Sequence, residues 1–191
     1  MSATAEEVGS MHYEDVTVGS PLPQLEVELN RSLIVAGAIA TRDYQDVHHD
    51  PDLARQRGAP DIFMNILTTN GLVGRFVTDW SGPCGLIESI AIRLGAPNYP
   101  GDTMVLTGQV SSLGGPSERN EGRGVVDVEV RGRNSIGNHV TGTVRVALPI
   151  RGGAGDRPAT EDRRLLDHGA EPRGDGAEPR GDGGEPRGGG R

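Results

Sequence analysis

Five stretches of the chain carry the apolar pattern of β-strands, and in most of them apolar and polar residues alternate. They occupy residues 25–29, 85–94, 103–113, 125–134 and 140–148. Residues that favour turns and loops separate the later stretches, at 97–102, 114–124 and 136–138. The last four strands therefore follow one another directly, which favours antiparallel pairing.

Between the first and second of these strands the pattern becomes helical. Residues 35–41 are small and apolar and predict a short buried helix. Asp50 followed by Pro51 predicts the start of a second short helix, because an acidic cap and a proline in the first turn favour initiation. Gly58 ends that helix, since glycine readily adopts the left-handed conformation found beyond a helix end.

Residues 64–80 predict the one long helix. Five apolar residues fall at helical spacing on one side: Ile66, Val73, Phe76, Val77 and Trp80. Gly71 and Gly74 lie inside this helix, where each costs about 1 kcal/mol relative to Ala, and we expect close approach of the helix to a sheet to compensate. The order of elements predicts an α+β fold, an antiparallel sheet wrapped around a long central helix.

Composition divides the chain, because the last 41 of its 191 residues differ from the rest. Residues 151–191 are rich in Gly, Pro, Arg and acidic residues and include three seven-residue repeats at 169–189. Such a segment buries too little apolar surface to offset its ordering entropy. We therefore predict a flexible N-terminus over 1–11, one domain over 12–150 and a disordered tail over 151–191.

Charge excludes several classes of function. All 19 basic residues are Arg, and 27 acidic residues leave a formal net charge of −8 with no basic stripe, so nucleic-acid binding is not expected. The sequence has no run of about 18 apolar residues, the length needed to cross a membrane. The N-terminus has no signal-peptide pattern. The single cysteine, Cys84, forms no internal disulfide and fits a reducing cytoplasm. We therefore expect a cytoplasmic protein that binds neither nucleic acid nor membrane.

One polar segment, residues 40–51, carries the side chains suited to chemistry. Asp43 and His48 are five residues apart, so they converge only if the chain turns between them. A converging pair could hold a water molecule between two acceptors or orient one imidazole tautomer. The stretch from His48 to Asp50 could instead be a polar helix cap, and this alternative stays open.

A metal site is not expected. His48 and His49 are adjacent, and adjacent histidines rarely bind one ion. The remaining histidines are distant in the sequence: His12, His139 and His168. Cys84 has no evident histidine partner and is expected to be a buried or incidental thiol.

Residues 42–50, Arg-Asp-Tyr-Gln-Asp-Val-His-His-Asp, resemble the active-site motif of the MaoC-like (R)-specific enoyl-CoA hydratases and dehydratases, Gly-Asp-x-Asn-Pro-[Ile/Val/Leu]-His-x-Asp. Three further stretches are similar to the same family. Residues 13–23 resemble its N-terminal segment, residues 62–68 the start of its long helix, and residues 97–103 a turn of its sheet. The resemblance covers residues 12–148 and implies a single hot-dog domain.

The resemblance also implies roles for individual residues. Asp43 and His48 would bind and deprotonate the attacking water, while Asn65 and Gln45 would serve oxyanion and substrate binding. Asn65 stands where the family has a helix-opening Gly whose backbone N–H binds the thioester oxygen. Gln45 replaces the family Asn, and Asp46 replaces the family Pro. No metal or redox cofactor is implied, and CoA enters as part of the substrate.

A narrower likeness is to the small MaoC-like subunit of steroid side-chain hydratases, carried by residues 41–50, 61–67 and 77–80. It implies hydration of a 2-enoyl-CoA from a steroid, cholesterol-type side chain. It also implies a heterotetramer with a larger MaoC-like subunit that carries a DUF35-type domain, and a lipid-transfer-type aldolase as a further partner.

Two other functions stay open for this chain. It could be a non-catalytic hot-dog subunit that completes the acyl-CoA site of a partner. It could also be a hot-dog acyl-CoA thioesterase, although such enzymes usually carry an attacking carboxylate on the long helix. Residues 64–78 contain no Asp or Glu, and Asp79 is the first.

Overall fold

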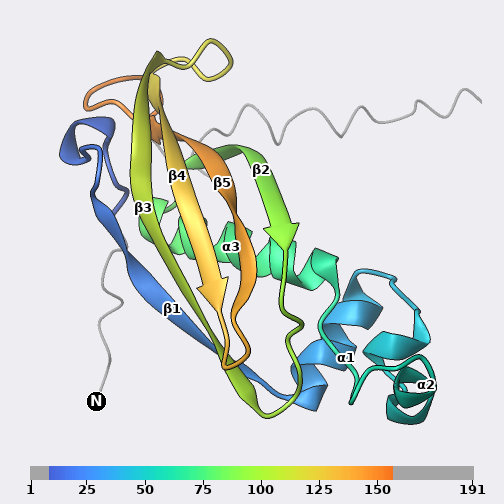
Figure 1. Ribbon diagram of the computed structural model, residues 1–191. Coiled ribbons are helices and arrows are strands. Elements are labelled where there is room, and N and C mark those ends of the chain that lie inside the picture. The colour runs from blue at the N-terminus through green and yellow to red at the C-terminus, as the bar shows by residue number, and fades with distance from the viewer. Residues whose placement is uncertain (1–8, 157–191) are drawn as a thin grey trace, which may run out of the picture. The chain divides into compact units, whose positions relative to one another are not determined.

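The computed structural model describes residues 9–156 of the chain (Figure 1). Residues 1–8 and 157–191 lie outside the described residues, and with them most of the predicted flexible N-terminus, most of the predicted tail and His168. The domain boundaries therefore stay a prediction.

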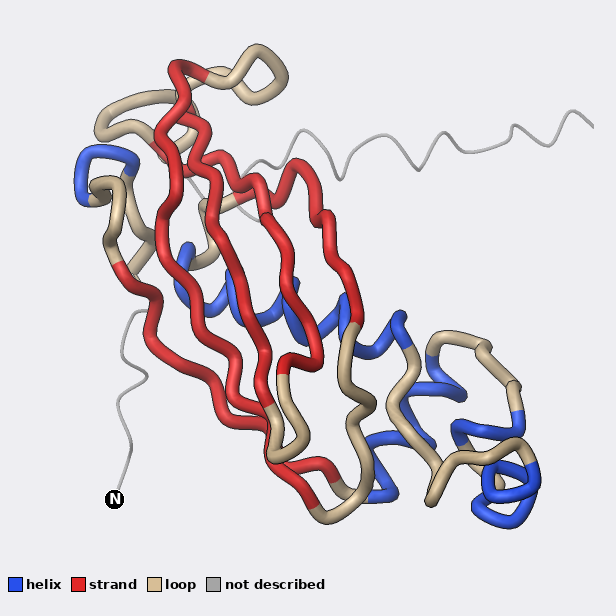
Figure 2. The backbone as a smooth tube through the Cα atoms, viewed as in Figure 1, coloured by secondary structure: helices blue, strands red, loops and turns tan. Residues whose placement is uncertain are grey.

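Five strands form one antiparallel sheet in the order β1-β3-β4-β5-β2. Their bounds are β1 Pro21–Leu29, β2 Leu86–Leu94, β3 Asp102–Pro116, β4 Arg123–Arg133 and β5 Asn138–Pro149. The long helix α3, Ile66–Ser81, runs along one face of this sheet. In Figure 2 the helix is seen in blue behind the red strands. The predicted α+β hot-dog architecture is confirmed.

The core lies between α3 and the sheet face toward it. Helix α3 contributes Val73, Phe76 and Val77, each at most 2% exposed. The strands contribute fully buried side chains at alternate positions: Met104, Leu106, Val126, Val128, Val144 and Val146. This alternation is the pattern from which the strands are predicted, because successive strand residues point to opposite faces.

Two expectations about α3 are wrong. Ile66, expected on the buried face, is 49% exposed because the first turn of α3 extends past the sheet toward the small helices (Figure 1). The internal glycines are not sites of tight approach. A Cβ at Gly74 would meet the Ile90 side chain at an ordinary 3.6 Å, and one at Gly71 would meet nothing within 4 Å.

Short helices fill the connection between β1 and α3. They are α1 Arg31–Ala40, the 3-10 turn η2 Asp46–His48 and α2 Pro51–Gln56, and a further 3-10 turn, η1 Tyr13–Asp15, precedes the sheet. The predicted cap of α2 is confirmed, since the Asp50 carboxylate accepts from the N–H groups of Asp52 and Leu53. None of the helices within residues 9–156 has both the length and the apolar character needed to cross a membrane.

The loop predicted over 114–124 is shorter than expected. Strand β3 continues to Pro116 and β4 begins at Arg123, so Pro116 pairs with Gly124. Gly and Pro predict a break here, but the ladder of the long hairpin extends through them because each strand supplies backbone partners for the other.

Helix α1 ends in a Schellman motif, the turn that redirects the chain toward Asp43. The N–H of Arg42 donates to the Ile39 carbonyl at 3.0 Å and the N–H of Asp43 donates to the Ala38 carbonyl at 2.9 Å. This motif requires a left-handed residue, usually Gly. Arg42 occupies the position with φ of +57° and is the one non-glycine residue with positive φ among those described. Helix α2 ends in the same motif, with Gly58 at φ of +89°.

Arg42→Gly is therefore expected to raise the free energy of unfolding by about 0.5–1 kcal/mol, because a side chain in the left-handed region strains the backbone. Urea denaturation of the wild type and the variant measures this difference. Gly58→Ala is the matched opposite change, since an added Cβ there meets nothing within 4 Å, and it should lower the free energy by about 1 kcal/mol. A loss of stability in Arg42→Gly would contradict the assigned strain.

Candidate active site

Asp43 and His48 meet just beyond the end of α1. The left-handed Arg42 turns the chain out of the helix, and η2 then brings His48 back toward Asp43. Asp43 Oδ2 and His48 Nε2 lie 3.4 Å apart. The chain thus makes the turn that convergence requires, and the polar-cap alternative applies to Asp50 rather than to His48.

The imidazole of His48 is buried and held in one orientation. Only 6% of the residue is exposed, and Nδ1 lies 2.7 Å from the carbonyl oxygen of Phe63. A carbonyl only accepts, so Nδ1 carries a proton, and in the neutral ring Nε2 is then an unprotonated acceptor. In return, the N–H of Phe63 donates to the Val47 carbonyl at 3.0 Å. These two bonds fix η2 against the segment that precedes α3.

The Asp43 carboxylate faces this free nitrogen. Its side chain is 16% exposed, and Oδ2 accepts a hydrogen bond from Asn65 Nδ2 at 3.1 Å. An ionised carboxylate and an unprotonated imidazole nitrogen both only accept, so they cannot bond to each other. A water molecule can donate to both, because a point about 2.8 Å from each atom exists when the two atoms are 3.4 Å apart. The pair is therefore suited to hold a nucleophilic water.

The N-terminus of α3 lies at the same site. Asn65 is its N-cap, and its Oδ1 accepts from the Thr68 N–H at 3.0 Å. Within residues 9–156, the backbone N–H groups of Asn65 and Ile66 make no hydrogen bond. Free donors at the positive end of a 16-residue helix favour an oxygen atom that gains negative charge.

Two of the family positions that differ in this chain lie at the start of η2. Gln45 is exposed, and its backbone nitrogen lies 3.5 Å from Asp43 Oδ1. Asp46, at the family Pro position, pairs with Arg57 at the end of α2, with an N–O distance of 2.5 Å. This ion pair ties η2 to α2 where a proline would have restricted the backbone.

A buried histidine that sequence reasoning does not place at this site supports it from the sheet. Gly132 pairs with Val140 and Arg133 with Asn138, so His139 is the extra residue of a β-bulge. The ring is 1% exposed, with Nδ1 2.7 Å from the Ala96 carbonyl oxygen and Nε2 2.8 Å from Thr69 Oγ1. The bulge thus directs His139 onto the first turns of α3, and no periodicity in the sequence signals a bulge.

Burial lowers the pKa of His139 below its usual 6.5, against a smaller opposite effect of the Ala96 carbonyl. The unfolded chain therefore binds this proton more tightly than the folded one. We expect the free energy of unfolding to fall as the pH drops from 7 to 5, with a slope of at most about 1.4 kcal/mol per pH unit. Urea denaturation at several pH values should give His139→Gln a smaller slope of unfolding free energy against pH than the wild type has. The exposed His49→Gln should keep the wild-type slope. Equal slopes in the two variants would contradict the role assigned to His139.

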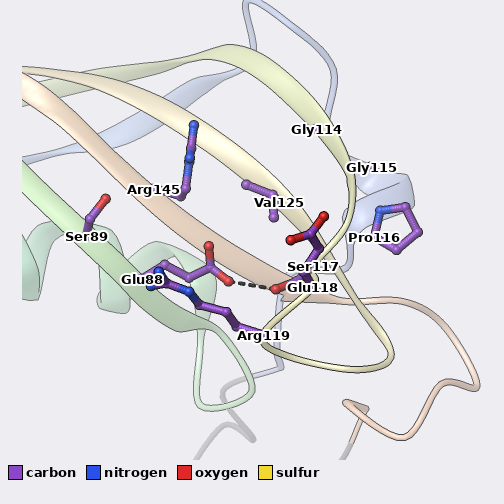
Figure 3. A pocket seen from close by; sticks show the side chains of 10 residues that line it. All are labelled: Glu88, Ser89, Gly114, Gly115, Pro116, Ser117, Glu118, Arg119, Val125 and Arg145. Carbon is purple, nitrogen blue, oxygen red and sulfur yellow. Dashed lines mark hydrogen bonds between the residues drawn. The ribbon is translucent and has the colours of Figure 1, made fainter.

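A hollow at the other end of the sheet offers no comparable chemistry. It has a volume of about 510 Å³ and lies beside the β3–β4 loop (Figure 3). Its Glu88 carboxylate accepts from Ser117 Oγ at 2.7 Å and from Asn120 Nδ2 at 2.9 Å. These bonds, with the hydroxyl of Ser117 foremost, hold the pKa of Glu88 below its usual value. Glu88 therefore anchors the loop. Among the described residues, no three His, Cys, Asp or Glu side chains could hold a metal ion together.

Comparison with known proteins gives one curated relative of high similarity. The chain is 49% identical over 131 residues to the 3-oxo-4,17-pregnadiene-20-carboxyl-CoA hydratase beta subunit of Mycobacterium tuberculosis. The match covers 69% of this chain and 95% of that subunit. No protein-family model matches the chain.

Solved structures similar to this chain include a complex that contains a closely similar subunit and two proteins of the same fold. A chain of the ChsH1-ChsH2 complex from Mycobacterium tuberculosis is 48% identical, with a TM-score of 0.63 over 69% of this chain and 98% of that one. The R-hydratase PhaJ1 from Pseudomonas aeruginosa has a TM-score of 0.64 at 17% identity, over 74% of this chain and 87% of that one. A MaoC-like dehydratase from Rhodospirillum rubrum has a TM-score of 0.64 at 21% identity, over 74% of this chain and 98% of that one. The last two likenesses concern the fold alone.

Proposed function

Since the chain belongs to the MaoC-like enoyl-CoA hydratase family, we propose that it adds water to a 2-enoyl-CoA thioester to give a 3-hydroxyacyl-CoA. It is an enoyl-CoA hydratase, a hydro-lyase, and acts as the catalytic subunit of a heteromeric enzyme. The observation that carries this proposal is the Asp43–His48 pair, two acceptors 3.4 Å apart beside free N–H groups of α3.

The first step is attack by water. Asp43 Oδ2 and His48 Nε2 each accept a hydrogen bond from the same water molecule, which places its oxygen lone pair toward C3 of the enoyl group. As the C3–O bond forms, the pair takes one proton from the water. The electron pair of the C2–C3 double bond moves toward the thioester carbonyl oxygen, which becomes an enolate oxygen.

The second step returns a proton. The Asn65 N–H, at the positive end of α3, stabilises the enolate oxygen while it carries charge. The protonated pair then delivers the proton to C2 on the face from which water attacked, and the double bond to oxygen is restored. No metal or redox cofactor takes part, and CoA is a portion of the substrate. Gln45, the residue before η2, is proposed to bind the substrate.

The acyl group is proposed to be a steroid side chain. The relative from Mycobacterium tuberculosis is named for a pregnadiene carboxyl-CoA. Four large apolar side chains beside the catalytic segment and the start of α3 stay exposed: Ile39, Tyr44, Ile66 and Leu67. Such a surface suits a bulky apolar acyl group and a second subunit, since large exposed apolar patches mark binding sites.

The enzyme is proposed to assemble with a second chain. One of the related solved structures is a complex of ChsH1 and ChsH2. The partner would be a larger MaoC-like subunit with a DUF35-type domain, in a heterotetramer that also contacts a lipid-transfer-type aldolase. Such an assembly would act in the cytoplasm in cholesterol-type steroid degradation.

The thioesterase alternative has no support at α3. Asp79 lies at the far end of that helix from the Asp43–His48 pair, is exposed, and pairs with Arg75 at 3.2 Å. A carboxylate placed there cannot attack a thioester bound at the N-terminus of the helix. The non-catalytic alternative predicts that Asp43 and His48 can be replaced without loss of turnover.

The proposed function is tested by co-expressing the chain with the MaoC-like protein encoded beside it. The loss of enoyl-thioester absorbance is followed with a steroid enoyl-CoA and with crotonyl-CoA. Turnover of the steroid substrate supports the whole proposal. Turnover of crotonyl-CoA alone keeps the chemistry and removes the steroid assignment. A well-folded complex that is inactive on both substrates would refute catalysis by this chain.

A further inference from the structure

We infer that the side chain of Asn65 is a positioning residue that holds the Asp43 carboxylate in its reactive orientation. The inference rests on the proposed function, because it concerns the same Asp43–His48 pair. It is distinct from the role of the Asn65 backbone N–H, since it uses the side-chain amide and acts through Asp43 rather than on the substrate.

All the hydrogen-bonding capacity of the amide NH₂ group is directed at two acceptors. Nδ2 donates to Thr41 Oγ1 at 2.9 Å and to Asp43 Oδ2 at 3.1 Å, and the residue is 2% exposed. Oδ1 accepts the N–H of Thr68 at 3.0 Å. The reverse amide orientation would set an N–H₂ group against the Thr68 N–H and an acceptor against the carboxylate. Only the observed orientation satisfies the three partners.

Thr41 anchors the amide to the body of the protein. Its hydroxyl lies 2.8 Å from the Gly37 carbonyl oxygen and 3.2 Å from that of Ala38, so the hydroxyl proton is committed to α1. Thr41 Oγ1 is therefore an acceptor toward Asn65. The side chain of Asn65 thus spans from the last turn of α1 to the first turn of α3, and Asp43 is held between the two helices.

The carboxylate has little else to restrain it. Its other oxygen is 3.5 Å from the Gln45 nitrogen, at the limit of a hydrogen bond. Oδ2, the atom that Asn65 holds, is the one that lies 3.4 Å from His48 Nε2. Without the amide, rotation of the carboxylate would move the acceptor that positions the water. Displacement of a reacting group by about 1 Å can cost about 100-fold in rate.

Helix capping alone does not require this residue. Ser, Thr and Asp cap helices about as well as Asn, and Asn30 and Asp50 cap α1 and α2 in this chain through oxygen atoms alone. Asn combines an acceptor for the helix with a donor for the carboxylate. Ser at this position keeps the cap but cannot reach Asp43, and Asp would place a second negative charge beside it.

The first test is Asn65→Ser in the complex with the partner subunit. We expect kcat to fall about 10- to 100-fold, with KM within about threefold of the wild type. The melting temperature should be only modestly lower, since Ser retains the cap but not the two bonds of Nδ2. Asn30→Ser is the matched control, because it makes the same change at another capping Asn, and it should leave kcat unchanged. A variant Asn65→Ser with wild-type kcat would overturn the inference.

The second test does not depend on turnover. In a crystal structure of Asn65→Ser, the Asp43 carboxylate should rotate or occupy two conformers, so that the 3.4 Å separation from His48 Nε2 is lost. A carboxylate that keeps its position refutes the positioning role, whatever the activity. If the wild-type complex is inactive, the proposed function fails and this crystallographic result alone decides the inference about Asn65.

Discussion

Asp43→Asn is expected to lower the hydration rate of the complex by about 10³-fold, within the range of about 10² to 10⁴ that general acid–base groups contribute. The change is isosteric, so the fold and the substrate surface should persist. The amide replaces an acceptor-only group by one that also donates, and its NH₂ group can bond directly to His48 Nε2. In the wild type, His48 Nε2 lies 3.4 Å from Asp43 Oδ2. An amide nitrogen in the position of Oδ2 would donate to His48 Nε2, and the water would lose its place between the two acceptors.

The measurement is the steady-state loss of enoyl-thioester absorbance by the purified complex. Asp79→Asn supplies the matched control, since it makes the same substitution at an exposed carboxylate near the opposite end of α3. It should retain the wild-type rate. Near-wild-type turnover in Asp43→Asn would favour the non-catalytic hot-dog subunit, whereas a loss confined to Asp79→Asn would favour the thioesterase.

His48→Gln is expected to have an effect of similar size, a loss of about 10² to 10⁴ in kcat. The variant removes the imidazole that accepts a proton from water and returns one to the substrate. It also removes the bond from Nδ1 to the Phe63 carbonyl, which holds η2 in place. A second variant, His48→Asn, separates these effects, because its amide can approach the Phe63 carbonyl but has no group in place of Nε2.

Both His48 variants should lose turnover, and His48→Asn should keep more of the thermal stability. His49→Gln is the neighbouring control. The His49 ring is exposed and its Nε2 lies 3.2 Å from the Tyr44 carbonyl oxygen, away from the pair. If His48→Asn folds and turns over at the wild-type rate, the imidazole takes no part in the reaction. A double variant of Asp43 and His48 should lose little more than either single one, because the two residues act as a unit.

Most of the fold can be predicted from the sequence. Period-two alternation marks the strands because a half-buried sheet alternates its side chains, and Asp50-Pro51 and Gly58 mark the ends of α2 through their backbone preferences. The errors lie where a neighbour overrides local preference. Pro116 continues β3 because β4 supplies a partner, and Ile66 is exposed because α3 extends past the sheet.

Alternation, capping chemistry and a motif are enough to predict the α+β class, the strand and helix pattern and the two residues of the pair. How these residues are supported depends on contacts that form only in the folded chain. Asn65 reaches Asp43 and Thr41 across 22 and 24 residues, and His139 reaches Thr69 across 70. Such contacts leave no local period or propensity in the chain, because they depend on helix packing and on one bulge in the β4–β5 ladder.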